Sequence, residues 1–90
     1  MPTITHPGQA GTVESSDILI IIAPAAPASG VTIELTSPVS KQYGRQIKAV
    51  ILETLAAEGV TDVIVTAQDK GALDCTIRAR VKTAIARALA

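Results

Sequence analysis

Few side chains in this chain of 90 residues have the types and spacing that catalysis requires. A self-sufficient active site needs a nucleophile beside a base, a pair of carboxylates or a metal site. The single histidine, His6, lies among prolines and glycines, which would not hold a general base in place. The single cysteine, Cys75, excludes an internal disulfide and a metal site built on several thiolates. The sequence therefore predicts no catalytic residue and no metal site.

Cys75 and two aspartates keep weaker chemical alternatives open. Cys75 falls early in a predicted helix, where thiols can become reactive, so a small thiol enzyme is one alternative. A small, partly buried helix residue is the simpler interpretation. Asp69 and Asp74 could form a carboxylate pair, but helix capping and the helix dipole account for both residues.

Two groups of basic residues recur at helical spacing. Lys41, Arg45 and Lys48 are three to four residues apart, and so are Arg78 and Lys82. Solvated helix surface is the simplest interpretation. The functional alternative is a docking face for an acidic partner or for the phosphates of a bound group. The chain's net charge of zero and its 1% aromatic content argue against nucleic acid as the partner.

The composition predicts one small globular domain, since 48% of the residues are hydrophobic and 18% are charged. Residues 1–11 lack periodicity and are predicted to be a flexible tail, which leaves a domain over residues 12–90. This tail has neither the basic nor the apolar region of a secretion signal. The apolar run over residues 18–28 is too short and too rich in proline to span a bilayer. We therefore expect a cytoplasmic protein that does not bind membranes.

The hydrophobic pattern predicts three strands and two helices. The strands are expected over residues 13–23, 31–36 and 60–67, and the helices run from Ser37 to Gly59 and from Ala72 onward. Ser37 and Pro38 resemble a helix cap and a first helical residue. The order β-β-α-β-α predicts an α/β two-layer sandwich, with both helices on one face of a small sheet. The first two strands are expected to pair as antiparallel neighbours.

Each predicted helix carries one apolar stripe that should face the core. In the first helix the stripe consists of Val39, Tyr43, Ile47, Val50, Ile51, Thr54 and Leu55; in the second it consists of Leu73, Ile77, Val81, Ala84, Ile85 and Ala88. Gly44 interrupts the first helix at a cost of roughly 1 kcal/mol relative to Ala. This pattern argues against the all-helical bundle on which acyl carrier proteins are usually built.

Three segments resemble the citrate lyase acyl carrier protein family. They are AGTVESSD over residues 10–17, KQYG over residues 41–44 and DKGALDCTIRARVKTAIARA over residues 69–88. Their order and spacing fit from about Gln9 to Ala88, and the last segment is the most specific. The carrier subunit of malonate decarboxylase is similar as well, but more distantly.

The resemblance implies a covalent prosthetic group on Ser15, with the neighbouring Ser16 as the alternative attachment site. The group in this family is phosphoribosyl-dephospho-CoA, joined to the serine by a phosphodiester. It bears acetyl and citryl thioesters while citrate is cleaved to acetate and oxaloacetate. The implied partners are the alpha and beta subunits of citrate lyase and a prosthetic-group transferase. The rival hypotheses are the malonate decarboxylase carrier and a noncovalent assembly module.

Overall fold

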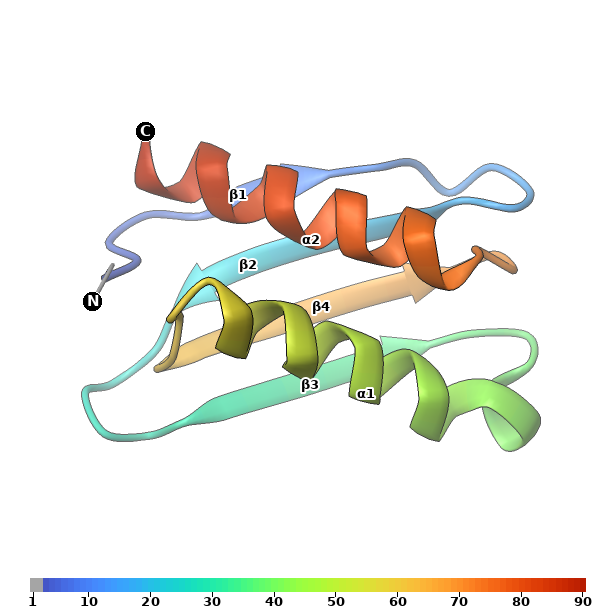
Figure 1. Ribbon diagram of the computed structural model, residues 1–90, viewed down its shortest axis with the longest axis horizontal. Coiled ribbons are helices and arrows are strands. Elements are labelled where there is room, and N and C mark those ends of the chain that lie inside the picture. The colour runs from blue at the N-terminus through green and yellow to red at the C-terminus, as the bar shows by residue number, and fades with distance from the viewer. Residues whose placement is uncertain (1–2) are drawn as a thin grey trace.

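The computed structural model describes residues 3–90, which form a four-stranded sheet with two helices on one of its faces (Figure 1). The elements are β1 (Gly8–Ala10), β2 (Ile18–Pro24), β3 (Val31–Thr36), α1 (Ser40–Ala57), β4 (Val63–Asp69) and α2 (Asp74–Leu89). The predicted α/β class and the placement of both helices on one face are confirmed. The observed order has one strand more than predicted, at its start.

The sheet has the strand order β1-β2-β4-β3, with β2 antiparallel to both of its neighbours and β3 parallel to β4. The expected antiparallel pairing of the first two predicted strands is therefore wrong. Ala67 of β4 lies between the two, opposite Ile20 of β2 on one side and Leu35 of β3 on the other. The reason is the connection through α1, which is long enough to return the chain parallel to β3.

Strand β1 lies inside the segment that was predicted to be a flexible tail. Gly8 pairs opposite Ile22 of β2, and the structure also buries Ile4. A Cβ atom on Gly8 would collide with the backbone of α2, so this glycine lets the helix pack directly on the strand. The tail prediction is corrected at Ile4 and over residues 8–10. Residues 1 and 2 lie outside the described part of the chain, and the domain boundary at residue 12 stays a prediction.

The hydrophobic core lies between the sheet and the two helices. It consists mainly of Ile18, Ile20 and Ile22 of β2, Val63, Val65 and Ala67 of β4, Ile47, Val50, Ile51 and Leu55 of α1, and Ile77, Val81, Ala84, Ile85 and Ala88 of α2. The predicted helix stripes are therefore confirmed over most of their length. Tyr43 and Leu73 are exceptions: they are 55% and 70% exposed, because each stripe extends beyond the core at the start of its helix.

Helix α1 begins at Ser40, two residues later than the predicted start at Pro38. Ser37 does not cap the helix. Its Oγ donates to Asp69 Oδ2 at 2.8 Å and accepts from the N–H of Val39 at 3.2 Å. The Ser37 hydroxyl instead ties the approach to α1 to the buried carboxylate of Asp69 at the end of β4.

Candidate functional site

The loop over residues 11–17 connects β1 to β2 and carries both candidate serines at its tip. Ser15 and Ser16 are exposed and form the middle of a tight turn. The N–H of Asp17 closes this turn by donating to the carbonyl of Glu14 at 3.2 Å. Strand β2 begins immediately afterwards at Ile18, so the serines lie a few residues from the core.

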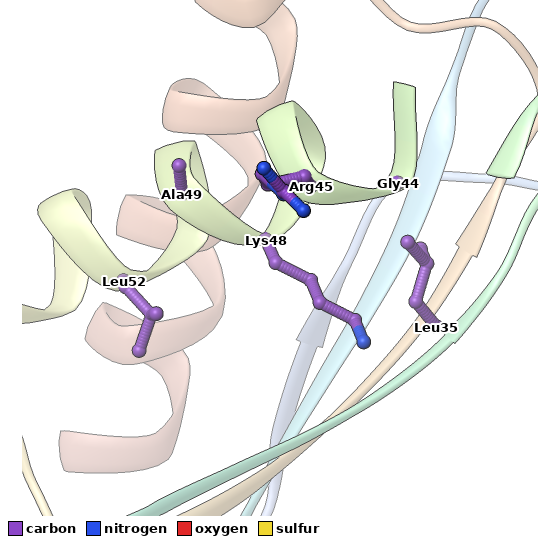
Figure 2. A pocket seen from close by; sticks show the side chains of 6 residues that line it. All are labelled: Leu35, Gly44, Arg45, Lys48, Ala49 and Leu52. Atoms are coloured by element: carbon purple, nitrogen blue, oxygen red, sulfur yellow. The ribbon is translucent and has the colours of Figure 1, made fainter. Parts of the chain in front are cut away.

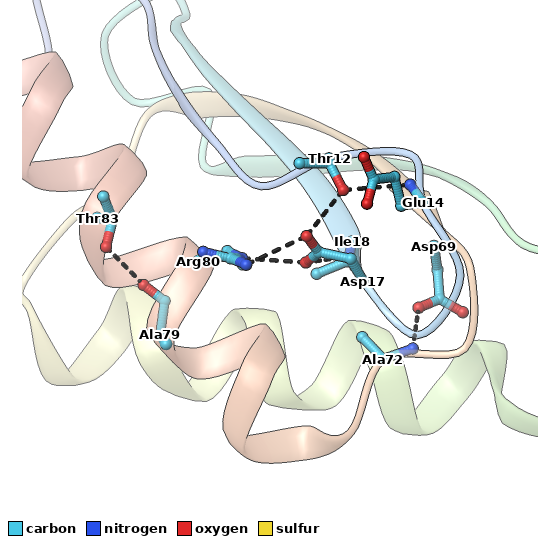
Figure 3. A network of polar contacts seen from close by, with 9 residues as sticks. All are labelled: Thr12, Glu14, Asp17, Ile18, Asp69, Ala72, Ala79, Arg80 and Thr83. Carbon is cyan, nitrogen blue, oxygen red and sulfur yellow. Dashed lines mark hydrogen bonds and ion pairs between the residues drawn. The ribbon is translucent and has the colours of Figure 1, made fainter.

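A carboxylate and a guanidinium fix one side of this loop. Arg80 of α2 donates from Nε to Asp17 Oδ1 at 3.0 Å and from Nη2 to Asp17 Oδ2 at 3.1 Å (Figure 3). The same carboxylate accepts from Thr12 Oγ1 at 2.9 Å and from the N–H of Ile18 at 2.7 Å. The Asp17 side chain is only 14% exposed, so four donors satisfy a largely buried charge.

These contacts favour the ionised form of Asp17. The hydrogen bond from Arg80 is the largest cause, followed by the N–H of Ile18, and together they lower the Asp17 pKa from 3.8 to about 2. Partial burial opposes this shift but does not outweigh it. The carboxylate therefore stays charged at neutral pH and holds the loop against α2.

The connection after β4 fixes the other side of the loop. The N–H of Ser16 donates to the carbonyl of Lys70 at 2.8 Å, and the N–H of Lys70 donates to the carbonyl of Asp17 at 2.9 Å. These two bonds continue the pairing of β2 with β4 beyond Ile18 and Asp69. Gly11, the first residue of the loop, has a φ of 93°. A Cβ atom at this position would overlap the carbonyl of Ile18.

The two serines differ in how strongly the loop holds their backbone. Ser16 is held by its backbone bond to Lys70 and has φ of 65°, a conformation that L residues adopt at a cost. Ser15 forms no hydrogen bond with any residue between positions 3 and 90. Its exposed hydroxyl projects from a turn that is fixed on both sides. A large group attached there would displace no packed side chain.

An apolar cleft of about 400 Å³ lies between the start of α1 and the connection from β4 to α2. Its walls include Val39, Tyr43, Ile47, Ala72 and Leu73. Lys70, which bonds the serine loop, is the first residue of this connection. The surroundings of the loop thus have room for an organic group, and they contain the exposed ends of both helix stripes.

The other candidate residues do not gather into a second site. His6 and Cys75 are exposed, and Cys75 is a free thiol. Asp69 is buried and accepts from Ser37 and from the N–H of Ala72 at 3.0 Å, while Asp74 accepts from Gln46. Both carboxylates therefore have structural partners. Within residues 3–90, no three acidic, histidine or cysteine side chains are arranged to hold a metal ion.

The five basic residues singled out from the helical pattern, Lys41, Arg45, Lys48, Arg78 and Lys82, are all exposed. Sequence reasoning missed the contributions of Arg80 and Lys70 to the serine loop. Arg80 lies 63 residues from Asp17, and nothing in the local pattern singles it out. Neither helix is long and apolar enough to cross a membrane, as far as residues 3–90 are concerned.

Comparisons with known proteins show which family the chain resembles. The family model described as malonate decarboxylase delta subunit (MdcD), an acyl carrier family, matches residues 5–88. A citrate lyase acyl carrier protein from Lacticaseibacillus casei is 58% identical, over 94% of this chain and 82% of the relative. The corresponding protein from Vibrio cholerae is 51% identical, over 94% and 86% of the two chains.

A solved structure shows the same fold in a more distant protein. A chain of a Pseudomonas malonate decarboxylase hetero-tetramer superimposes with a TM-score of 0.76 and 17% identity, covering 98% of this chain and 92% of its own. At that identity the match shows the fold alone. The close relatives share about half of their residues with this chain along nearly its whole length. The chain therefore belongs to the citrate lyase acyl carrier protein family, and its role is that of a non-catalytic carrier subunit.

Proposed function

We propose that this chain carries its acyl groups on a phosphoribosyl-dephospho-CoA arm joined to Ser15 by a phosphodiester. The observation that carries the proposal is the contrast at the tip of the loop over residues 11–17. The Ser15 hydroxyl is exposed and unbonded within the described chain, whereas the residues around it are held by Arg80 and Lys70. A phosphodiester requires an accessible hydroxyl, and a transferase must be able to reach it.

The loop geometry supports Ser15 over Ser16. Both hydroxyls are exposed, but the backbone N–H of Ser16 is bonded to Lys70 at 2.8 Å and its φ is 65°, whereas Ser15 forms no hydrogen bond within residues 3–90. An attached group also needs a firm base if it is to reach defined places. Asp17 and Gly11 supply this base, since both fix the loop against the core side of β2.

The arm supplies a terminal thiol that holds acyl groups as thioesters. We infer that the alpha and beta subunits of citrate lyase act in turn on the acyl group that this chain presents, and that a dedicated transferase attaches the arm in the cytoplasm. Tethering raises the effective concentration of the acyl group at both active sites. The chain's own residues position the arm and leave the catalytic groups to the partners.

A malonate decarboxylase carrier is the nearest alternative, because the matching family model and the similar solved structure are both described by that enzyme. The identities favour citrate lyase, since they are 51–58% for its carriers and 17% for the decarboxylase chain. The acyl group found on the arm would separate the two functions.

The test is intact-mass analysis and peptide mapping of the chain purified from its native host grown on citrate. We expect an added mass equal to phosphoribosyl-dephospho-CoA on the peptide that contains Ser15. Ser15→Ala should fold normally, remain unmodified and abolish citrate cleavage by the assembled complex. Ser16→Ala is the matched control and should keep the added mass. Modification of the Ser15→Ala chain, or an unmodified chain in an active complex, would overturn the proposal.

A further inference from the structure

An open groove of about 630 Å³ runs between α1 and the edge strand β3 (Figure 2). Its lining consists of Leu35, Gly44, Arg45, Lys48, Ala49 and Leu52. The side chain of Lys48 extends from the helix toward Leu35 of the strand (Figure 2). The groove therefore combines an apolar floor with cations from one helix.

Among residues 3–90, nothing pairs with the outer side of the strand below the groove. β3 is the last strand in the sheet order, so alternate backbone N–H and C=O groups point away from β4. Proteins usually protect such edges, because an exposed edge pairs readily with another chain. β3 has six residues, against three in β1 at the opposite edge, which α2 covers closely. The β3 edge is therefore the better site for an added strand.

The helix that lines the groove contains a residue that lowers its intrinsic stability. Gly44 lies inside α1 and is buried, although an alanine would favour the helix by roughly 1 kcal/mol. Leu52 is 46% exposed and lies about two helical turns beyond the glycine. The exposed Leu52 at one end of the groove and the half-buried Leu35 below it leave apolar surface that another chain could cover.

The charges of the groove have no partner in the part of the chain that the structure describes. Arg45 and Lys48 form no ion pair and no side-chain hydrogen bond with the residues that the structure describes. No acidic residue lines the groove. Arg80 differs, because its guanidinium is held by Asp17. An incoming carboxylate could therefore bind Arg45 or Lys48 without breaking an existing contact.

We propose that this groove binds an extended acidic segment of a partner subunit, which adds a fifth strand beside β3. Its backbone pairs with the β3 edge, alternate apolar side chains enter the groove, and carboxylates bind Arg45 and Lys48. The proposal rests on the proposed function for the identity of the partners as the lyase subunits. The Ser15 loop is bonded to Lys70 after β4, on the inner side of β3, so a strand added on the outer side of β3 pairs away from this loop.

The test measures binding of purified carrier variants to purified alpha and beta subunits by biolayer interferometry. Arg45→Glu combined with Lys48→Glu should raise the Kd at least tenfold for one of the two subunits. The matched control is Arg78→Glu combined with Lys82→Glu, which reverses two exposed charges four residues apart on α2. The control should bind nearly as the unchanged chain does, and thermal melting should show that both variants fold. Equal weakening by both pairs, or no weakening by the groove pair, would overturn the proposal.

Amide hydrogen exchange would identify which molecule occupies the groove. Amides of residues 31–36 should gain protection when the partner subunit binds. Protection in the modified carrier alone would assign the groove to the phosphates of its own arm, and a dimer that the groove variant dissociates would assign it to a second copy. Either result overturns the proposal, as does the absence of protection.

The two proposals fail separately. An unmodified Ser15 together with a groove-dependent Kd would remove only the proposed function. A modified Ser15 together with an unaffected Kd would remove only the docking site.

Discussion

The serine loop over residues 11–17 and the groove between α1 and β3 both place charged side chains at the surface, but they use charge in opposite ways. In the loop, Asp17 and Arg80 satisfy each other and hold the backbone in position. In the groove, Arg45 and Lys48 have no counterpart among the described residues. A paired charge stabilises the native conformation of one chain, whereas an unpaired charge is available to another molecule. Three pairs of substitutions and one pH profile test how firmly the serine loop is held and whether the groove charges serve the fold.

Gly11→Ala should produce the largest effect, a loss of at least about 3 kcal/mol in the free energy of unfolding. The added Cβ would overlap the carbonyl of Ile18, so the loop or β2 must shift. Gly71→Ala is the matched control: it has the same φ of 93°, but its Cβ would meet nothing. It should cost only about 1–2 kcal/mol for the left-handed conformation. Equal losses in urea denaturation would show that the loop is not rigid.

Arg80→Gln should destabilise the chain by about 1–2 kcal/mol, because it leaves the Asp17 carboxylate with fewer donors in a largely buried position. Arg45→Gln removes a cation that has no internal partner and should change stability by less than about 0.5 kcal/mol. Urea denaturation of both variants at neutral pH measures the difference. A comparable loss in the two would mean that Arg45 also serves the fold.

Acid should remove the contribution of Asp17. Its pKa is lowered from 3.8 to about 2 in the folded chain, so its stabilisation is complete above the unfolded value and is lost as the pH falls from about 4 through 2. Because Arg80 is 39% exposed, we expect this contribution to be only about 1 kcal/mol. Asp17→Asn should show a flatter decline of the unfolding free energy over this pH range. Identical pH profiles for the two chains would exclude the stabilising ion pair.

Ser16→Gly should have the smallest effect, a gain of up to about 1 kcal/mol, because glycine adopts positive φ without the steric cost that serine pays at 65°. Ser15→Gly is the control, since φ at Ser15 is not positive. It should bring no gain and, by adding freedom to the unfolded chain, a slight loss. The melting temperatures of the two variants test the asymmetry, and a gain at Ser15 instead would contradict the turn geometry.

Much of the fold could be predicted from local patterns. The stripe from Ile47 to Leu55 and the stripe from Ile77 to Ala88 face the core as their spacing indicates. Gly59 ends α1 in the left-handed conformation, and the N–H of Val60 returns to the carbonyl of Leu55 at 2.9 Å. Such features depend on residues within one or two turns of each other, so the chain encodes them locally.

The candidate site was only partly predictable. The segment that contains Ser15 stood out through its resemblance to one family and through its position before an apolar strand. The resemblance already implied Ser15 over Ser16, and the loop geometry adds support that the sequence could not supply, because φ at Ser16 and its bond to Lys70 depend on where β4 ends. Both anchors of the loop come from the second half of the chain.

The amino-acid sequence by itself determined the α/β class, the two helices, their core faces and the membership of a carrier family. The tertiary structure decided that three residues without periodicity form β1, that β4 lies between β2 and β3, and that Asp17 meets Arg80 across 63 residues. It also decided that Ser37 bonds Asp69 instead of capping α1. Strand pairing and ion pairs depend on which distant segments compete for the same neighbour, and no local pattern records the outcome of that competition.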